Sequence, residues 1–259
     1  MTVVRRLGAP ALIVAADHRA RGVVTIEQYD EYLRALHDVL PYCDGILASV
    51  QPLADLRASG ALGPAHRTYL SLNRTGLAGS VFELDDRQVI SVARAEAEGW
   101  SGVKLMVRID MEDGRTADAL EMAGRVIEEA ADRGLEAMIE FLPWSHGRLC
   151  RHGDAVVRAA VIAHDMGAPL LKLPVPEAAP GPARRAAVKR VVRSVGVPVL
   201  FLGGPLSGAD AESERQALLA ELSDVMDGGG AGMAVGRRLL LDPSPGGLAK
   251  QLSELVHLR

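Results

Sequence analysis

The feature that most constrains the fold is an eightfold alternation of short aliphatic runs with longer amphipathic stretches along the 259 residues. Charges in the amphipathic stretches recur at helical spacing, which predicts helices that pack on one face. The aliphatic runs are predicted strands at 11–17, 44–49, 67–73, 102–109, 136–143, 170–175, 198–204 and 231–240. The predicted helices span 26–40, 50–61, 86–99, 115–134, 152–167, 181–196, 211–227 and 245–257.

Strict alternation of strands with helices predicts a parallel sheet, and eight strands is the number that closes a barrel. We therefore predict an α/β fold, a single (β/α)8 TIM barrel domain over residues 1–259. The alternative is an open, doubly wound sheet, which more often has five or six strands and a glycine-rich loop after the first. The first run instead ends in Ala-Asp-His-Arg, which disfavours that alternative.

Composition and charge narrow the functional classes. The chain is 48% hydrophobic but only 3% aromatic, which suits the aliphatic strands of a buried parallel sheet. A net charge of −4 gives no basic surface for nucleic acid, and no apolar run approaches a membrane span or a secretory signal. Cys43 and Cys150 are far apart and lack His or Cys at metal spacing. We expect reduced thiols, no metal, no cofactor and a cytoplasmic location.

Barrel geometry indicates where the chemistry lies, because the active site of such a barrel forms at the carboxyl ends of its strands. The candidates are the polar residues and glycines within or just after the aliphatic runs. These are Asp17, His18, Asn73, Lys104, Arg108, Glu140, Lys172, Gly203, Gly204, Gly236 and Arg237.

Lysine usage singles out two of these candidates. Only four of the 29 basic residues are lysines, and Lys104 and Lys172 both lie inside aliphatic runs, where burying a charge is costly. Lysine, unlike arginine, can lose its proton and form an imine. Burial or a second cation lowers a lysine pKa from about 10.4 toward about 7–8 and frees the nucleophile.

These properties suggest Lys172 as the nucleophile and Lys104 as the second cation. Glu140 would lie between them as an acid–base or charge-balancing group, and Asp17 could accept a hydroxyl proton. The alternative for either lysine is a structural ion pair with Glu140, and Asp17 could instead cap a turn.

A phosphate site is predicted where the loops after the seventh and eighth strands meet. Gly203, Gly204 and Gly236 would let backbone N–H groups approach an anion, and Arg237 could add a bidentate contact. His18, Asn73 and Arg108 are candidate substrate-binding residues. Asn73 could equally bind a neighbouring side chain.

Six motifs fall in order along the chain: Ala-Asp-His-Arg at 16–19, Val-Lys-Leu at 103–105, Ile-Glu-Phe at 139–141, Leu-Lys-Leu-Pro-Val-Pro at 171–176, Gly-Gly-Pro at 203–205 and Gly-Met-Ala-Val-Gly-Arg at 232–237. In these motifs the chain resembles the class I aldolases of the archaeal fructose-bisphosphate aldolase type and their tagatose bisphosphate and sulfofructose phosphate relatives. The resemblance implies an imine on Lys172, polar partners Asp17, Lys104 and Glu140, and phosphate at Gly203, Gly204, Gly236 and Arg237. Such relatives often have a serine where this chain has Leu202.

The expected activity is therefore a metal-independent carbon–carbon lyase that acts on a phosphorylated keto-sugar or keto-sugar acid in sugar or inositol catabolism. Sugar bisphosphates, a deoxy-keto-gluconate phosphate and deoxyribose phosphate are the candidate substrates, and we expect a homo-oligomer. Two alternatives stay open. One is a barrel isomerase or epimerase that uses Glu140 and Asp17 as acid and base. The other is a non-catalytic sugar-phosphate-binding protein.

Overall fold

The computed structural model describes residues 7, 10–17, 28–73 and 86–258. Eight parallel strands close into a barrel, because each pairs with its neighbour and the first pairs with the last. They are β1 (Ala11–Ala16), β2 (Gly45–Ala48), β3 (Arg67–Ser71), β4 (Gly102–Ile109), β5 (Glu136–Ser145), β7 (Leu170–Leu173), β8 (Val199–Leu202) and β9 (Gly232–Val235). The predicted (β/α)8 TIM barrel is confirmed.

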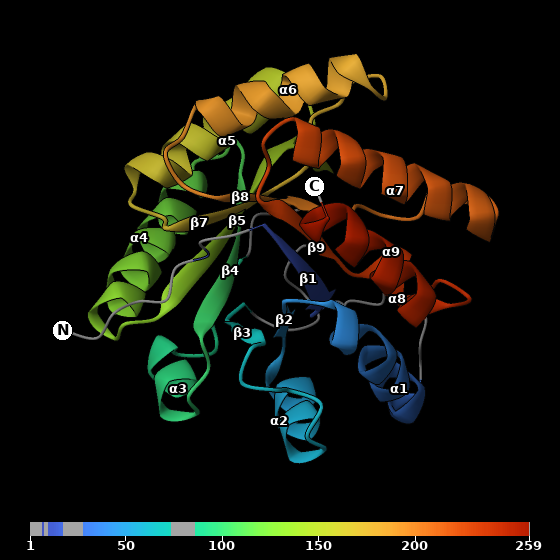
Figure 1. Ribbon diagram of the computed structural model, residues 1–259. Coiled ribbons are helices and arrows are strands. Elements are labelled where there is room, and N and C mark those ends of the chain that lie inside the picture. The colour runs from blue at the N-terminus through green and yellow to red at the C-terminus, as the bar shows by residue number, and fades with distance from the viewer. Residues whose placement is uncertain (1–6, 8–9, 18–27, 74–85, 259) are drawn as a thin grey trace.

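Helices surround the barrel between successive strands (Figure 1). They are α1 (Tyr29–Val39), α2 (Val50–Ala58), α3 (Val92–Ala97), α4 (Thr116–Asp132), α5 (Gly153–Asp165), α6 (Pro182–Arg193), α7 (Ala211–Asp227), α8 (Arg237–Leu240) and α9 (Pro245–His257). A 3-10 turn, η2 (Leu40–Tyr42), extends α1. In the part of the chain that the structure describes, no helix combines the length and the apolar character needed to cross a bilayer.

The eighth and the fifth predicted strands end differently in the structure. The predicted strand 231–240 is wrong beyond Val235, because Gly236 leaves the extended conformation (φ −118°, ψ −89°) and its carbonyl accepts the N–H groups of Leu239 and Leu240 in α8. The fifth strand continues past Pro143 and turns back as β6 (Arg148–Leu149), which pairs with it in an antiparallel hairpin.

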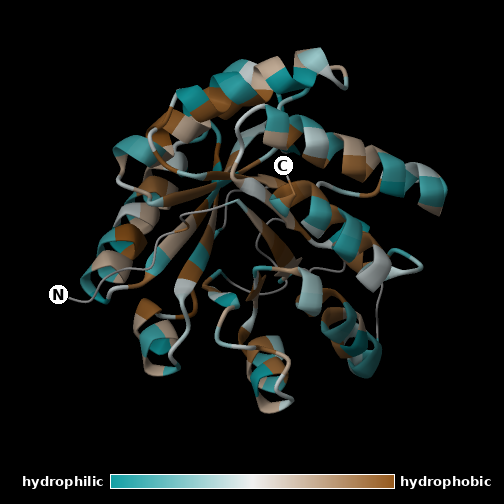
Figure 2. Cartoon of the chain, viewed as in Figure 1, coloured by the Kyte–Doolittle hydropathy of each residue, from teal (hydrophilic) through white to brown (hydrophobic). Residues whose placement is uncertain are grey.

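Side chains alternate along each strand between the helical layer and the barrel interior. Outward-facing side chains pack against the helices in the main core, and the apolar strands lie inside a ring of helices with polar outer faces (Figure 2). The interior is filled by a separate cluster of Leu7, Ala11, Ile13, Ala15, Leu47, Tyr69, Met138, Leu170, Leu200 and Ala234. Two positions beyond Met138 and Leu170, the same inward face carries Glu140 and Lys172.

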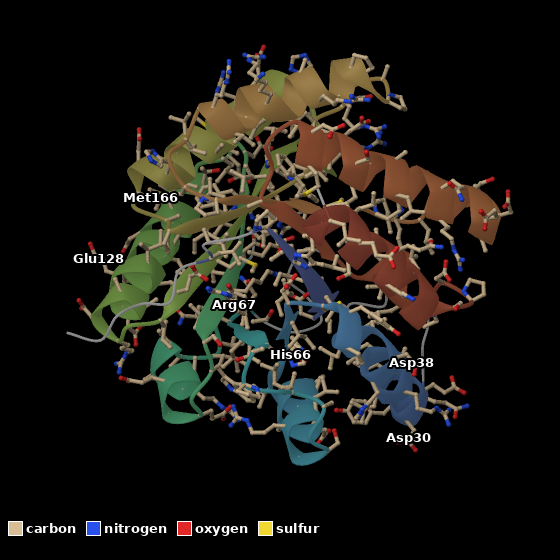
Figure 3. All side chains as sticks on the ribbon, in the orientation of Figure 1. Asp30, Asp38, His66, Arg67, Glu128 and Met166 are labelled. Atoms are coloured by element: carbon tan, nitrogen blue, oxygen red, sulfur yellow. The ribbon has the colours of Figure 1, made fainter. Side chains whose placement is uncertain are left out.

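A buried carboxylate closes the amino end of the barrel. Glu136 accepts hydrogen bonds from the Leu7 N–H (2.7 Å), Arg67 Nη1 (2.9 Å) and the Tyr69 hydroxyl (2.6 Å). Arg67 lies within the ring of helices, whereas Asp30, Asp38 and Glu128 lie on its outer side (Figure 3). Since this end is closed by tightly bonded groups, the carboxyl end is left for a binding site.

We expect Gly232→Ala to reduce the free energy of unfolding by more than about 3 kcal/mol. Gly232 has φ +115°, and a Cβ there would lie 1.9 Å from the Ala11 carbonyl oxygen across the β1–β9 seam. Gly60→Ala is the matched control, because Gly60 also has positive φ (+74°) but nothing within 4 Å of its Cβ position. It should cost only about 1 kcal/mol. Equal losses for both variants, measured by urea unfolding, would show that the seam does not demand glycine.

Candidate active site

Four charged side chains form a continuous row inside the carboxyl end of the barrel. Lys104 Nζ lies 2.9 Å from Asp17 Oδ2 and 2.5 Å from Glu140 Oε2, and Lys172 Nζ lies 3.1 Å from Glu140 Oε1. None of the four side chains is more than 6% exposed. The structure thus brings together the four residues for which catalytic roles were predicted, and their formal charges cancel.

Strand register explains how these residues meet. Glu140 on β5 pairs directly with Lys172 on β7. Lys104 on β4 pairs with Ser71 on β3. All face the interior, so the Lys104 side chain can reach Glu140 from one layer below. Ser71, which the sequence analysis missed, donates from its hydroxyl to Asp17 Oδ2 (3.0 Å). Its inward parity with Tyr69 is the signal that could have found it.

Burial and the neighbouring charges together lower the pKa of two members of the row, Glu140 and Lys172. Burial raises the pKa of Glu140, but the adjacent Lys104 and Lys172 ammonium groups outweigh it and hold that pKa at about 2. Burial lowers the pKa of Lys172, and Glu140 opposes this shift while Lys104 adds to it. At neutral pH, Glu140 is therefore ionised, and Lys172 loses its proton more readily than a free lysine does.

A cavity of about 180 Å³ opens above the row. Lys172 and Glu140 line it together with the four residues of the predicted phosphate site, Gly203, Gly204, Gly236 and Arg237. Across the cavity the wall is largely apolar and comes from the strand ends and the hairpin, at Met106, Leu142, Trp144, Leu149 and Leu202. One space therefore joins the lysine row to the glycine loops.

The glycines of the predicted phosphate site play different parts. The N–H of Gly203 donates to the Ala234 carbonyl (3.1 Å) and belongs to the barrel ladder, so it is not available to an anion in this structure. Gly203 instead provides space, since a Cβ there would lie 2.8 Å from Val235 Cγ1. Gly204 has φ +69°, and among the described residues no hydrogen bond occupies its N–H. The loop can therefore present the Gly204 amide to the cavity.

Two of the predicted substrate-binding residues have other partners. Arg108 is fully buried, and its guanidinium lies against Asp86, with Nε and Nη2 each 2.9 Å from Oδ1. Asn73 uses its amide to bind the backbone: Oδ1 accepts from the Met106 N–H (2.5 Å), and Nδ2 donates to the Met106 and Asp86 carbonyls. In this structure both side chains are thus engaged by groups of the protein itself. His18 lies outside the described residues.

Sequence reasoning also missed Asp86, which follows no aliphatic run and therefore carries no periodic signal. Leu142 could have been found, because it shares the inward parity of Glu140. Among the described residues no group of three or more His, Cys, Asp or Glu side chains is placed to hold a metal ion.

Comparison with known proteins places this geometry in a family. Residues 9–254 match the Cgl0159-like family. The chain belongs to that family. The solved structure of Cgl0159 from Corynebacterium glutamicum is 31% identical to it, covers 96% of this chain and 86% of the other, and superposes with a TM-score of 0.80.

This Cgl0159-like chain is also similar to proteins of lower sequence identity. It is 25% identical to 2-amino-3,7-dideoxy-D-threo-hept-6-ulosonate synthase 1 of Archaeoglobus fulgidus, over 95% of this chain and 85% of the relative. An archaeal fructose-1,6-bisphosphate aldolase, described with its catalytic lysine bound to the carbinolamine intermediate, is 23% identical over 98% and 96% of the two chains, with a TM-score of 0.74. The predicted resemblance to archaeal-type aldolases is thus confirmed at the level of fold.

We expect the buried Arg108–Asp86 ion pair to affect the free energy of unfolding through its charges. Asp86→Leu should lower the free energy of unfolding by about 3–5 kcal/mol, because it removes the carboxylate that faces a fully buried guanidinium. The double variant Asp86→Leu with Arg108→Met should recover most of this loss, since it buries no unpaired charge. Urea unfolding of both variants tests this. A double variant as unstable as the single one would attribute the loss to packing.

Proposed function

We propose that this protein is a class I aldolase that cleaves a phosphorylated keto-sugar or keto-sugar acid through an imine on Lys172. The observation that supports this most is the position of Lys172. It is a buried lysine with a lowered pKa, it lies 3.1 Å from an ionised glutamate, and it lines the same cavity as Gly204, Gly236 and Arg237. That arrangement provides a nucleophile, a proton carrier and an anion site within one space.

The geometry supports the following route to the imine. The free amine of Lys172 attacks the substrate ketone, and the new carbon–nitrogen bond gives a carbinolamine. Glu140, which contacts both lysines, takes the proton released by the nitrogen and delivers it to the carbinolamine oxygen to give a hydroxyl. Glu140 then takes up a second proton from solvent and passes it to this hydroxyl, which leaves as water. The product is a protonated imine. Lys104 holds Glu140 in place and keeps a positive charge near the departing oxygen.

Carbon–carbon cleavage uses the same carboxylate. Glu140, ionised again, accepts the proton of the substrate hydroxyl two carbons from the imine. The oxygen then forms a carbonyl, the carbon–carbon bond breaks, and its electron pair moves to the imine nitrogen to give an enamine. Glu140 suits this role better than Asp17, because Glu140 lines the cavity whereas Asp17 connects to it through Lys104. Protonation of the enamine and addition of water release the ketone and restore Lys172.

The anion site fixes the direction of the substrate. Gly204 and Gly236 lie at the ends of β8 and β9, and Arg237 begins α8 beside them. A phosphate at this position would place the carbonyl carbon over Lys172 and the remainder of the substrate toward the wall at Leu142 and Trp144. The names of the relatives, a ulosonate synthase and fructose-1,6-bisphosphate aldolases, support carbon–carbon chemistry on a keto compound. Sugar or inositol breakdown would provide such substrates.

The imine predicts covalent trapping. Reduction with borohydride in the presence of dihydroxyacetone phosphate should attach the three-carbon unit to Lys172, detected by intact mass and located by peptide mass. Lys172→Ala should abolish the adduct and lower turnover by at least about a thousandfold. Lys189→Ala is the matched control, because Lys189 is an exposed lysine on α6 and should leave trapping unchanged. A wild-type protein that forms no adduct, or a Lys172→Arg variant that retains turnover, would favour the isomerase or binding-protein alternatives.

We expect two substitutions in the charged row to move the pH midpoint of trapping at Lys172 in opposite directions. Since the pKa of Lys172 is lowered, the rate of trapping with cyanoborohydride should rise with pH around a midpoint below 10.5. Glu140 raises the Lys172 pKa, so Glu140→Gln should move the midpoint to lower pH. Lys104 lowers that pKa, so Lys104→Met should move the midpoint to higher pH. Shifts in the same direction would show that Glu140 and Lys104 do not act on the Lys172 pKa with opposite signs.

A further inference from the structure

A second buried ion cluster lies behind the glycine loop that follows β8. Arg238, the second residue of α8, is only 9% exposed. Its Nη1 lies 2.7 Å from Glu221 Oε2 and its Nε lies 3.5 Å from Glu214 Oε2, so one guanidinium faces two carboxylates of α7. Glu214 and Glu221 are themselves no more than 9% exposed.

The cluster holds both ends of the loop Gly203–Gly208. At the first end, Arg238 Nη1 donates to the Gly203 carbonyl (3.1 Å). At the other end, Glu214 Oε1 accepts from the N–H and hydroxyl of Ser207 and from the Gly208 N–H (3.1 Å). Arg238 Nη2 also donates to the Glu214 carbonyl (3.2 Å), which ties the two ends to one another.

Stability alone does not account for this cluster. Replacing a buried ion pair or triad with apolar residues of similar volume is often neutral or stabilising, so a chain selected only for stability would not need one here. The cluster does determine where the loop lies. Behind the loop is a cavity of about 290 Å³, lined by Ser207, Glu214, Glu221 and Arg238, into which an unheld loop has room to move.

We infer that Arg238 is a positioning residue for anion recognition: it holds the Gly203–Gly208 loop so that the Gly204 N–H faces the cavity above Lys172. Because Arg238 follows Arg237 in α8, the same contact fixes the loop after β8 relative to the loop after β9. This inference rests on the proposed function only in taking the bound anion to be the substrate phosphate. Arg238 itself does not touch the substrate.

The test compares ligands with and without a phosphate group. Cyanoborohydride trapping is measured over a range of concentrations of dihydroxyacetone phosphate and of unphosphorylated dihydroxyacetone, and binding of inorganic phosphate is measured by titration calorimetry. Arg238→Gln should raise the half-saturating concentration of dihydroxyacetone phosphate and the phosphate dissociation constant by roughly tenfold. This is the effect expected when the anion loses one charge-assisted hydrogen bond because the loop no longer holds its donor in place. The half-saturating concentration of dihydroxyacetone should stay unchanged, because this ketone has no phosphate for the loop to hold.

Two further variants keep the test interpretable. Arg238→Lys keeps the charge but not the fork, whose Nη1 reaches Gly203 and Glu221 and whose Nη2 reaches the Glu214 carbonyl, so it should recover part of the phosphate affinity. Arg215→Gln is the matched control: it removes another arginine–carboxylate pair between α7 and the segment after α8, at Asp242 (2.6 Å), without touching the loop. It should leave all three ligands unaffected. If Arg238→Gln does not fold, Glu221→Gln, which loosens the same guanidinium, takes its place.

The outcomes separate this inference from the proposed function. A selective loss of affinity for the two phosphate-bearing ligands supports it. Equal losses for dihydroxyacetone and its phosphate, or no loss for either, would overturn it and leave Arg238 as a structural residue. If wild-type protein forms no imine with either ketone but binds phosphate in an Arg238-dependent manner, the aldolase proposal fails and the positioning role stands. A wild-type protein that binds no phosphate overturns the inference.

Discussion

Every strand of a closed parallel barrel sends alternate side chains into one enclosed space, and the site of this protein depends on that constraint. Aliphatic side chains such as Met138 and Leu170 fill the lower interior layers. The next inward positions on the same strands are Glu140 and Lys172, so the charged row occupies the layer directly above the apolar filling. Among the described residues, apolar packing closes the interior from below, and Lys172 lines the cavity at the carboxyl end.

Charge balance limits the cost of burying this layer, but the balance is uneven between the two lysines. Two lysines and two carboxylates cancel formally, which limits the cost of burying them. The two lysines nevertheless have different numbers of carboxylate partners. Lys104 contacts both Asp17 and Glu140, whereas Lys172 contacts only Glu140 among the members of the row. Lys172 is thus the less stabilised ammonium, and burial dominates its pKa. Such a row adds little to stability, which the aliphatic core must supply.

The fold and the charged row were predictable because both are periodic. The alternation of runs predicted every barrel strand, and the scarcity of lysine together with a position inside aliphatic runs identified Lys104 and Lys172. Contacts without a period were not predictable. Asp86 reaches Arg108 from outside any regular element, α8 depends on the conformation of Gly236, and the N–H of Gly203 is taken by the ladder to Ala234. In each case the deciding interaction is a hydrogen bond or an ion pair whose partner no local pattern reveals.

Chemistry and recognition rest on different parts of this barrel. The lysine row is fixed by strand register, which a closed sheet holds firmly. In the proposed function, anion recognition rests on the loops after β8 and β9, and Leu202 offers no hydroxyl before the glycines. The proposed site would therefore hold an anion with backbone N–H groups and Arg237, whose contribution depends on loop geometry. A loop that carries recognition in its backbone needs its backbone held, and a buried guanidinium that donates to the Gly203 carbonyl does this directly.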